Sequence, residues 1–169
     1  GCIKFGSFKL KTKVISPIYI DFRHLISYPK ILDNIVDLMW DMIKEEDFNL
    51  IFGLAYAGIP IASILSNKYK VPMIFNRKEK KTYGCKKIIE GIYSEDSKCI
   101  IIDDVFTSGT SLNEGKQILN VAKIKFNNSV FICNRSKNKN VKALFTLNEI
   151  LSTLAMHQKI DSDIYQKCI

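Results

Sequence analysis

Cys99-Ile100-Ile101-Ile102-Asp103-Asp104-Val105-Phe106-Thr107-Ser108-Gly109-Thr110-Ser111 is the most informative segment of this chain. Its apolar beginning predicts a buried strand, Cys99 to Asp104, which delivers two adjacent carboxylates to its carboxyl end. A short turn of Thr, Ser and Gly follows, and Ser111 is expected to open a helix. Ligands of α/β proteins bind where such strands end, so this segment is the first candidate for a binding site.

The turn from Thr107 to Ser111 predicts a phosphate-binding loop. Backbone N–H groups converge at the start of a helix, and the helix dipole favours an anion there. Gly109 allows the positive φ or the close backbone approach that wrapping an anion requires. Hydroxyl donors are available from Thr107, Ser108, Thr110 and Ser111.

The two carboxylates must serve another part of the same ligand, because Asp103 and Asp104 would repel a phosphate. Neighbouring ribose hydroxyls or a hydrated Mg²⁺ are the natural partners of such a pair. A structural alternative also stays open. In that case the acids simply end a strand, and Ser111 is an N-cap with Glu114 at the capping-box distance. The two interpretations are compatible with each other.

Length and composition predict one globular domain, 1–169. The chain has 169 residues, of which 47% are hydrophobic, and this is enough for a sizeable core. No apolar run approaches the roughly 20 residues of a membrane span, so no membrane partner is expected. The cysteines at 2, 85, 99, 133 and 168 form no C-x-x-C pair. This spacing favours reduced thiols and a cytoplasmic location over a zinc or disulfide framework.

The formal net charge of +8 is concentrated in one segment. Between Arg77 and Lys87, six basic residues face a single acid, Glu79. A solvated basic loop and a nucleic-acid contact are two alternatives. Neither accounts for a phosphate loop in the same chain, whereas a small and highly anionic substrate accounts for both. We therefore expect no nucleic-acid partner.

Extended and helical patterns alternate along the chain and predict an α/β fold. This alternation implies a parallel sheet with helices on both faces. Strands are expected at 50–52, 71–75, 99–104, 129–133 and 143–145, with two short strands within 4–23. Helices are expected at about 30–45, 59–69, 111–125 and 147–157, and from about 161 onward.

Five blocks, in the order of the family, resemble orotate phosphoribosyltransferase, a type I phosphoribosyltransferase. The first block, Lys4–Lys11 with Ser16–Arg23, is most similar to the domain found in eukaryotic UMP synthases. The segment quoted above resembles the signature with which type I enzymes bind phosphoribosyl pyrophosphate (PRPP). The remaining blocks are Gly53–Pro60, Arg77–Gly84 and Asn134-Arg135. The first block and the basic block are the ones typical of orotate enzymes.

The resemblance implies the type I phosphoribosyltransferase fold, a central, mostly parallel sheet flanked by helices. A small hood from about 1–25 and 134–169 would cover a core of about 26–133. The implied reaction transfers 5-phosphoribosyl from PRPP to N1 of orotate with Mg²⁺, giving orotidine 5'-monophosphate and pyrophosphate in the synthesis of UMP. Two alternatives remain: an enzyme for another base, uracil or a purine, and a non-catalytic PRPP-binding regulatory module.

The resemblance also implies roles for individual residues. Lys81 would be the catalytic lysine, and Asp103 and Asp104 would hold the ribose, with Mg²⁺ bound through PRPP and water rather than by direct protein ligands. Orotate contacts are expected from Lys11, Tyr19, Ile20, Thr107 and Arg135. PRPP contacts are expected from Lys11, Tyr56, Ala57, Arg77, Lys78, Lys81, Tyr83, Asp103, Asp104, Val105, Phe106, Thr107, Ser108, Gly109, Thr110 and Ser111.

Without the ordered blocks, the candidate orotate contacts would have ordinary structural explanations. Lys11 and Arg135 would be surface charges, and Tyr19 and Ile20 would be half-buried strand residues. Segment 77–91 corresponds to a mobile loop that reaches the neighbouring subunit's site in this family, so a homodimer is implied.

Three departures from the family pattern bear on activity. Thr12-Lys13 stands where Ser-Gly is common, Thr82 replaces a loop acid, and Asn134 replaces the usual Asp before Arg135. The loss of the loop acid concerns the turnover rate more than ligand binding. We expect a compact stand-alone enzyme or a shortened form of a longer one, without an orotidylate decarboxylase domain.

Overall fold

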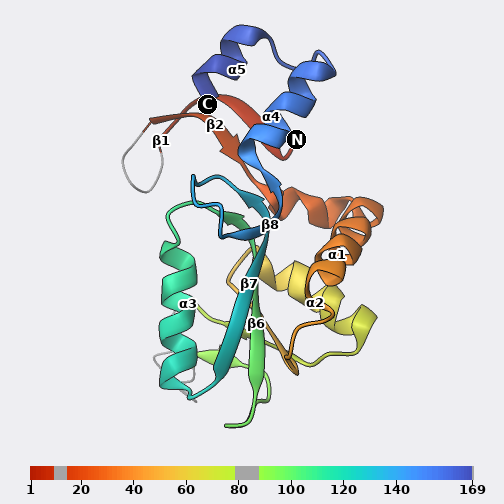
Figure 1. Cartoon of the computed structure of the whole chain (residues 1–169), viewed down its shortest axis with the longest axis vertical. Helices are drawn as coiled ribbons and strands as arrows, with labels where there is room; N and C mark the ends of the chain where they lie inside the picture. Colours follow the sequence, from red (N-terminus) through yellow and green to blue (C-terminus); the bar gives the residue numbers. More distant parts are fainter. Residues whose placement is uncertain (10–14, 79–87, 169) are drawn as a thin grey trace.

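A central β-sheet organises the computed structural model, which describes residues 1–9, 15–78 and 88–168 (Figure 1). Its strands are β3 (Leu50–Gly53), β4 (Met73–Asn76), β5 (Ile89–Glu90), β6 (Lys98–Phe106), β7 (Lys125–Asn134) and β8 (Lys142–Thr146). Their spatial order is β5-β4-β3-β6-β7-β8. Only β4 and β5 pair in antiparallel fashion, and the other neighbours are parallel. The expected α/β fold with a mostly parallel sheet is confirmed.

Helices cover both faces of this sheet. Helices α1 (Pro29–Ile43) and α2 (Gly58–Tyr69) lie on one face, and α3 (Thr110–Val121) lies on the other (Figure 1). Alternate strand residues serve the two faces: Ile100 and Ile102 join the cluster with α1 and α2, whereas Ile101 packs with α3. Because both faces are buried, the strands are continuous apolar runs.

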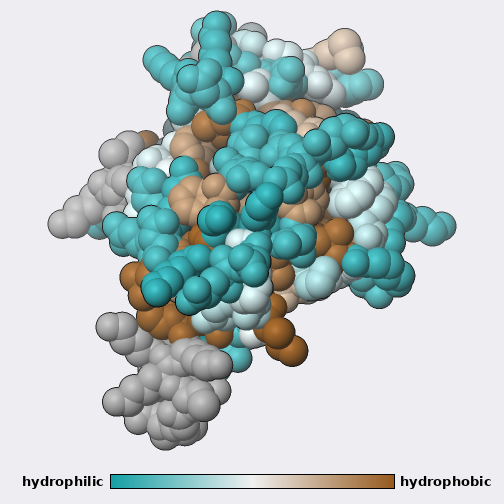
Figure 2. Space-filling model, turned by 60° about the horizontal axis from the view of Figure 1, so that its bottom comes forward, coloured by the Kyte–Doolittle hydropathy of each residue, from teal (hydrophilic) through white to brown (hydrophobic). Residues whose placement is uncertain are grey.

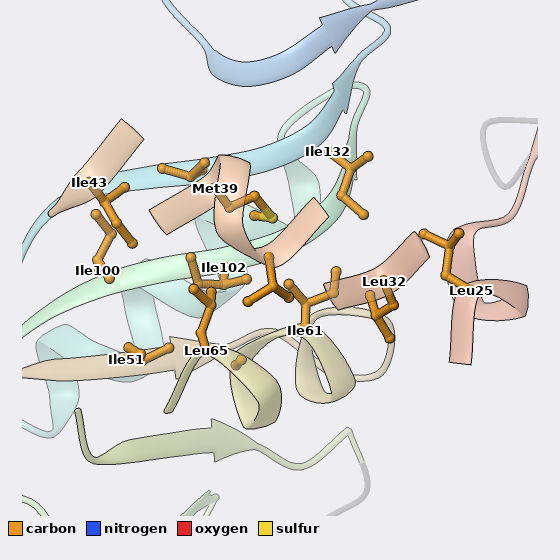
Figure 3. Packing of buried hydrophobic residues seen from close by; sticks show 13 residues of the cluster. Leu25, Leu32, Met39, Ile43, Ile51, Ile61, Leu65, Ile100, Ile102 and Ile132 are labelled. Atoms are coloured by element: carbon orange, nitrogen blue, oxygen red, sulfur yellow. The ribbon is translucent and has the colours of Figure 1, made fainter. Parts of the chain in front are cut away.

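The apolar stripe of α1 accounts for its position. Leu32, Val36, Met39 and Ile43 recur at helical spacing and are all buried. They pack against α2 and the sheet in the cluster of Figure 3. Burying one such side chain contributes about 2 kcal/mol to stability, so the stripe fixes the helix against the sheet.

A smaller layer, called the hood below, lies at one end of the sheet with both termini (Figure 1). It consists of β1 (Ile3–Lys9), β2 (Ile15–Ile20), α4 (Leu147–Met156) and α5 (Ser162–Cys168). The two strands pair in antiparallel fashion. Their buried residue Ile18 shares a cluster with Leu151 of α4 and Cys133 of β7. Since Cys133 is near the carboxyl end of β7, the hood covers the carboxyl edge of the sheet.

Several boundaries differ from the expectations drawn from the sequence. Strand β6 continues two residues beyond the acids, because Val105 and Phe106 pair with β7. Helix α3 begins at Thr110 with Gly109 as its N-cap residue, so Ser111 is not the cap. Strand β7 begins at Lys125, where the sequence pattern still suggested a helix.

The last strand changes the extent of the hood. Because β8 pairs with β7 in parallel, residues 142–146 belong to the central sheet. The C-terminal part of the hood therefore begins at α4, and not near 134 as expected.

Hydrophilic side chains cover most of the surface seen in Figure 2, with smaller hydrophobic areas among them. Val121 and Ile92 are examples of large apolar side chains that are exposed. Within the described part of the chain, no helix has the length and apolar character needed to cross a membrane.

Candidate active site

The candidate site lies where the strand order reverses, between β3 and β6. From β3 the chain moves outward to β4, whereas β6 and the strands after it lie on the other side of β3. Open α/β sheets bind ligands beyond the carboxyl ends of the strands at such a switch point. The acidic pair and the loop after β3 both lie there.

Asp103 and Asp104 lie where the buried part of β6 ends. The side chain of Asp103 is buried and that of Asp104 is half-buried. Asp103 Oδ1 accepts from the Asp104 N–H at 3.0 Å, and Asp104 Oδ1 accepts from the Val105 N–H at 2.7 Å. Burial raises the pKa of Asp103 above its ordinary value, and the neighbouring Asp104 carboxylate raises it further. Burial also raises the pKa of Asp104.

The loop 107–111 connects the acidic pair to α3. Gly109 has a φ of 78°, and a Cβ at this position would lie 3.2 Å from the ring of Phe106. That ring packs edge-on against Phe131 and anchors the loop on the sheet. The hydroxyls of Ser108 and Thr110 are 2.9 Å apart. The exposed hydroxyl side chains at the start of α3 are those of Thr107, Ser108, Thr110 and Ser111.

The loop 54–57 is held against both neighbouring strands. The Leu54 N–H donates to the Ile102 carbonyl of β6 at 3.0 Å. The Ala55 N–H donates to Asn76 Oδ1 of β4 at 2.9 Å. The Ala55–Tyr56 peptide bond is cis, and Ala57 is the N-cap residue of α2. These contacts place the exposed side chain of Tyr56 beside the switch point.

A pocket of about 620 Å³ adjoins this loop. The Lys78 ammonium lies 5.0 Å from the centroid of the Tyr56 ring, and its positive charge acts on Asp103. Arg77 also lines this pocket, and its NH1 donates to Glu90 Oε1 of β5, another lining residue, at 2.9 Å. The pocket is lined by Tyr56, Ile59, Phe75, Asn76, Arg77, Lys78 and Glu90.

Tyr19 and Ile20 end the hood strand β2 and differ in their surroundings. The Ile20 side chain is buried in the hood cluster. Any ligand contact of Ile20 would therefore use its backbone. Tyr19 is half-buried, with its ring centroid 5.5 Å from that of Phe8, and its hydroxyl accepts from Arg23 NH2 at 3.2 Å.

Arg135 links the hood to the end of β6. Its N–H donates to the Phe106 carbonyl at 2.8 Å, and its NH2 donates to Ser16 Oγ of β2 at 3.2 Å. Among the described residues, Arg135 Nε is the buried side-chain nitrogen or oxygen that lacks a hydrogen-bond partner. A ligand oxygen at this position would satisfy it.

The structure thus brings together residues 103–111, Tyr19, Tyr56, Ala57, Lys78 and Arg135 around the carboxyl edge of the sheet. Arg77 lines the pocket beside Tyr56 and Lys78, where it is paired with Glu90 of β5. The predicted contacts Lys11, Lys81 and Tyr83 lie outside the described residues, as do Thr12, Lys13 and Thr82.

The donor set fits a magnesium ion that keeps most of its ligands from substrate and water. In the ranges the structure describes, no cluster of three or more His, Cys, Asp or Glu could enclose a metal. Mg²⁺ commonly binds through one or two carboxylates together with substrate phosphates and waters. Asp103 and Asp104 offer two carboxylates next to a phosphate loop.

Several residues at the site had no role assigned from the sequence. Asp21 and Arg23, just after β2, approach the acidic pair from the hood side, and the charges of both act on Asp104. Asn76 ties the 54–57 loop to β4. The strand-ending position of Asn76 is a signal that could have identified it, whereas the approach of Arg23 depends on tertiary packing.

Comparison with known proteins agrees with this geometry. The family model described as "Phosphoribosyl transferase domain" matches residues 24–152. The chain is 33% identical to bovine uridine 5'-monophosphate synthase over 97% of its own length, but it covers only 36% of that protein. It is 31% identical to orotate phosphoribosyltransferase of Caenorhabditis elegans, covering 95% of this chain and 71% of that one.

Among solved structures, UMP synthase of Leishmania donovani superimposes with a TM-score of 0.89 at 31% identity, over 99% of this chain and 38% of that one. This chain thus spans little more than a third of the UMP synthases that it matches. It covers most of the length of the single-function nematode enzyme, and the family match covers most of the chain itself. The chain belongs to the orotate phosphoribosyltransferase family of type I phosphoribosyltransferases.

Proposed function

We propose that this chain transfers the 5-phosphoribosyl group of PRPP to N1 of orotate, giving orotidine 5'-monophosphate and pyrophosphate. The observation that carries the proposal is the position of Arg135. Its main-chain N–H donates to Phe106 at the end of the strand that carries the acidic pair, and its buried Nε lacks a partner among the described residues. Partners for a ribose phosphate and for an anionic, planar base therefore meet at one edge of the sheet.

PRPP would lie along the carboxyl edge, from loop 107–111 to loop 54–57. The 5'-phosphate would accept hydrogen bonds from backbone N–H groups and hydroxyls at the start of α3. The ribose hydroxyls would donate to Asp103 and Asp104. The pyrophosphate would lie near Tyr56 and Lys78, where a positive charge is available. This order separates the phosphate from the carboxylates that would repel it.

Orotate would bind between Tyr19 and Arg135. The guanidinium of Arg135 offers a fork of donors to the carboxylate or carbonyl oxygens of the base. Nitrogen N1 then faces C1' of the ribose. In the reaction the N1–C1' bond forms, the bond from C1' to the pyrophosphate oxygen breaks, and the proton of N1 is lost.

The chain would accelerate this step mainly by alignment and charge. C1' becomes positive as pyrophosphate departs, and the carboxylates of Asp103 and Asp104 lie on the ribose side of it. Fixing two reactants in one orientation supplies a further large part of the rate enhancement. Bound Mg²⁺ would supply positive charge to the departing pyrophosphate, held by substrate oxygens and water near this acidic pair. Lys81 stays the proposed catalytic lysine and Arg77 a proposed pyrophosphate contact.

We also propose a homodimer and a cytoplasmic location, with no nucleic-acid or membrane partner. The resemblance of segment 77–91 to the loop that serves a neighbouring subunit supports the dimer. The described cysteines, Cys2, Cys99, Cys133 and Cys168, are all free thiols, which is consistent with a reducing compartment.

The test is turnover with PRPP, Mg²⁺ and orotate, followed by the loss of orotate absorbance and the release of pyrophosphate. Wild-type protein should consume both substrates in equal amounts. Uracil, adenine, guanine and hypoxanthine, offered singly and in competition, should not replace orotate. Binding of PRPP without orotate-dependent pyrophosphate release would refute the proposal and indicate a non-catalytic module. Turnover with another base would assign a different acceptor.

A further inference from the structure

Two charged residues of the hood, Asp21 and Arg23, are not among the expected PRPP and orotate contacts. Asp21 and Arg23 follow β2, at the entrance of the 3-10 helix η1 (Phe22–Ser27). Arg23 binds Asp21 in a fork: Nε donates to Oδ1 at 2.7 Å and NH2 donates to Oδ2 at 2.7 Å. The same NH2 donates to the Tyr19 hydroxyl at 3.2 Å. One guanidinium thus joins an acid and the tyrosine of the hood strand.

The acid in this pair is largely withdrawn from solvent. The side chain of Asp21 is 12% exposed, whereas that of Arg23 is 56% exposed. The backbone N–H of Asp21 donates to the Cys2 carbonyl, just before β1, at 2.7 Å. This bond ties the end of β2 to the N-terminal segment of the hood. The packing of η1 against β6 brings this pair toward the acidic end of β6. The negative charge of Asp21 opposes the ionisation of Asp104.

Arg23 supplies the opposing charge. The carboxylate of Asp21 raises the pKa of Asp104, and the guanidinium of Arg23 lowers it. In the other direction, the hydrogen bond and the charge of Asp21 raise the pKa of Arg23, and the charge of Asp104 adds to this in the same direction. The guanidinium therefore acts on both sides: by hydrogen bonds on Asp21 and Tyr19, and by charge on Asp104.

We propose that Arg23 is a positioning residue that holds Tyr19 and the acidic pair of β6 in one frame, so that the acceptor base and the ribose meet correctly. This inference rests on the proposed function for the identity of the two ligands. In this role Arg23 does not need to contact PRPP or orotate directly. Asp21 serves as the anchor that fixes the direction of the guanidinium.

A capping role for Arg23 does not account for these contacts. The N-cap interaction of η1 uses the backbone N–H of Arg23, which donates to Asp21 Oδ1 at 3.1 Å. Any residue other than proline at position 23 would keep that bond. The side-chain fork and the bond to Tyr19 are additional, so substitutions at Arg23 remove them selectively.

The test compares Arg23→Gln and Arg23→Lys with wild type in KM for each substrate, in kcat and in Tm. The matched control is Lys167→Gln, which removes another exposed cation with a close acidic partner, Asp163 at 2.6 Å, from α5. Arg23→Gln should raise KM for both orotate and PRPP by about tenfold, the effect expected for losing a charged hydrogen-bond donor. The control should leave both KM values at the wild-type level.

Arg23→Lys separates the two sides of the role. Lysine keeps the charge that acts on Asp104 but lacks the fork that binds Asp21 and Tyr19 together. KM for PRPP should therefore return to within about threefold of wild type, while KM for orotate stays raised. Arg23→Gln with both KM values within about twofold of wild type would overturn the proposal. Equal KM values in the two variants for both substrates would also overturn it.

The inference about Arg23 can still be tested if the wild-type chain does not turn over orotate. That result would refute the proposed function, and calorimetric titration with PRPP and Mg²⁺ would then decide the inference. An affinity about tenfold weaker in Arg23→Gln supports the action of Arg23 on the acidic pair, and equal affinity overturns it. If Arg23→Gln lowers Tm enough to impair folding, the two KM values of Arg23→Lys decide instead: a raised KM for orotate with KM for PRPP near wild type supports the inference, and both KM values at the wild-type level overturn it.

Discussion

Gly58 lies directly against the Ile102 carbonyl of β6, and a Cβ on Gly58 would be 2.3 Å from that oxygen. The same Cβ would be 3.2 Å from Cα of Asp103. These are backbone atoms of a central strand, so they cannot rotate away as a side chain could. The start of α2 can therefore approach the acidic pair this closely only with glycine at position 58.

We expect Gly58→Ala to destabilise the fold and to damage the site together. Relieving the clash would shift α2 or β6, at a cost of about 1–3 kcal/mol or more. Urea unfolding followed by circular dichroism would measure the loss. Asn67→Ala, on the exposed surface of the same helix, is the control and should change stability by less than about 0.5 kcal/mol. Equal stability of Gly58→Ala and wild type would contradict the close packing.

Asp103→Asn should stabilise the ligand-free protein at neutral pH while it weakens PRPP binding. Burial raises the pKa of Asp103, so the folded state binds this proton more tightly than the unfolded chain does. The free energy of unfolding of wild type should then fall as pH rises from about 4, the ordinary value for Asp, through the raised pKa. Asparagine carries no such proton and keeps an oxygen that can accept from the Asp104 N–H.

The difference in Tm between Asp103→Asn and wild type should be large at pH 7.5 and should shrink as pH falls toward about 4. The advantage at neutral pH should be about 1 kcal/mol or more, since one pKa unit corresponds to about 1.4 kcal/mol. Asp96→Asn, at an exposed position, is the control for a general charge effect. A Tm difference that grows on acidification would contradict a raised pKa for Asp103 in the folded protein.

The sequence predicted where the acidic pair and the hydroxyl loop lie in the fold better than it predicted the bounds of the elements around them. The order of an apolar strand, an acidic pair and a hydroxyl loop is local, so residues 103–111 could be found from the pattern alone. The extension of β6 to Phe106 could not, because it depends on pairing with β7. Helix α3 begins after Gly109, whose left-handed backbone makes it the N-cap residue. The sequence pattern had offered Ser111 as the N-cap instead.

Long-range contacts were the least predictable part of the site. Arg23 and Arg135 are far apart in the sequence, and the hood strand β2 brings them to the same edge of the sheet through Tyr19 and Ser16. Only the family resemblance had pointed to Arg135, and Arg23 ended the first family block without a role assigned to its side chain. Composition and periodicity do not tell which charged residues of the hood will lie near the acidic pair of the sheet.

Arg135→Lys should raise KM for orotate without a comparable change for PRPP. Lysine keeps the charge but loses Nε and the fork, leaving one oxygen of the base without its donor. The expected rise is about tenfold or more in KM for orotate. Lys137→Gln, two residues on and exposed, should leave KM unchanged. A selective rise in KM for PRPP would place Arg135 at a different ligand.

Asn134→Asp should destabilise the loop that follows β7, although the family pattern usually has Asp at this position. Asn134 Nδ2 donates to the Asn138 carbonyl at 2.8 Å, and its Oδ1 accepts from the Ser136 N–H at 2.8 Å. Aspartate can keep the second bond, but it would set a carboxylate oxygen against the carbonyl of Asn138.

The expected loss for Asn134→Asp is about 1–3 kcal/mol in the free energy of unfolding, because Asn134 is buried. Chemical denaturation compared with Asn140→Asp, at an exposed position of the same loop, would measure it. If both variants lose the same small amount, the amide of Asn134 has no specific role in closing the loop.

Lys81→Ala should lower kcat far more than it weakens PRPP binding. The basic block places several lysines in one segment, and the family resemblance singles out Lys81 among them as the residue that acts in the reaction. General acid–base or charge-stabilising groups of this kind contribute about 10² or more to kcat. Lys80→Ala is the matched control, since it removes the same charge one residue earlier. Steady-state rates and PRPP titrations on both variants separate the two effects. Similar, small losses of kcat and of affinity in both variants would mean that the segment acts only as a diffuse positive charge.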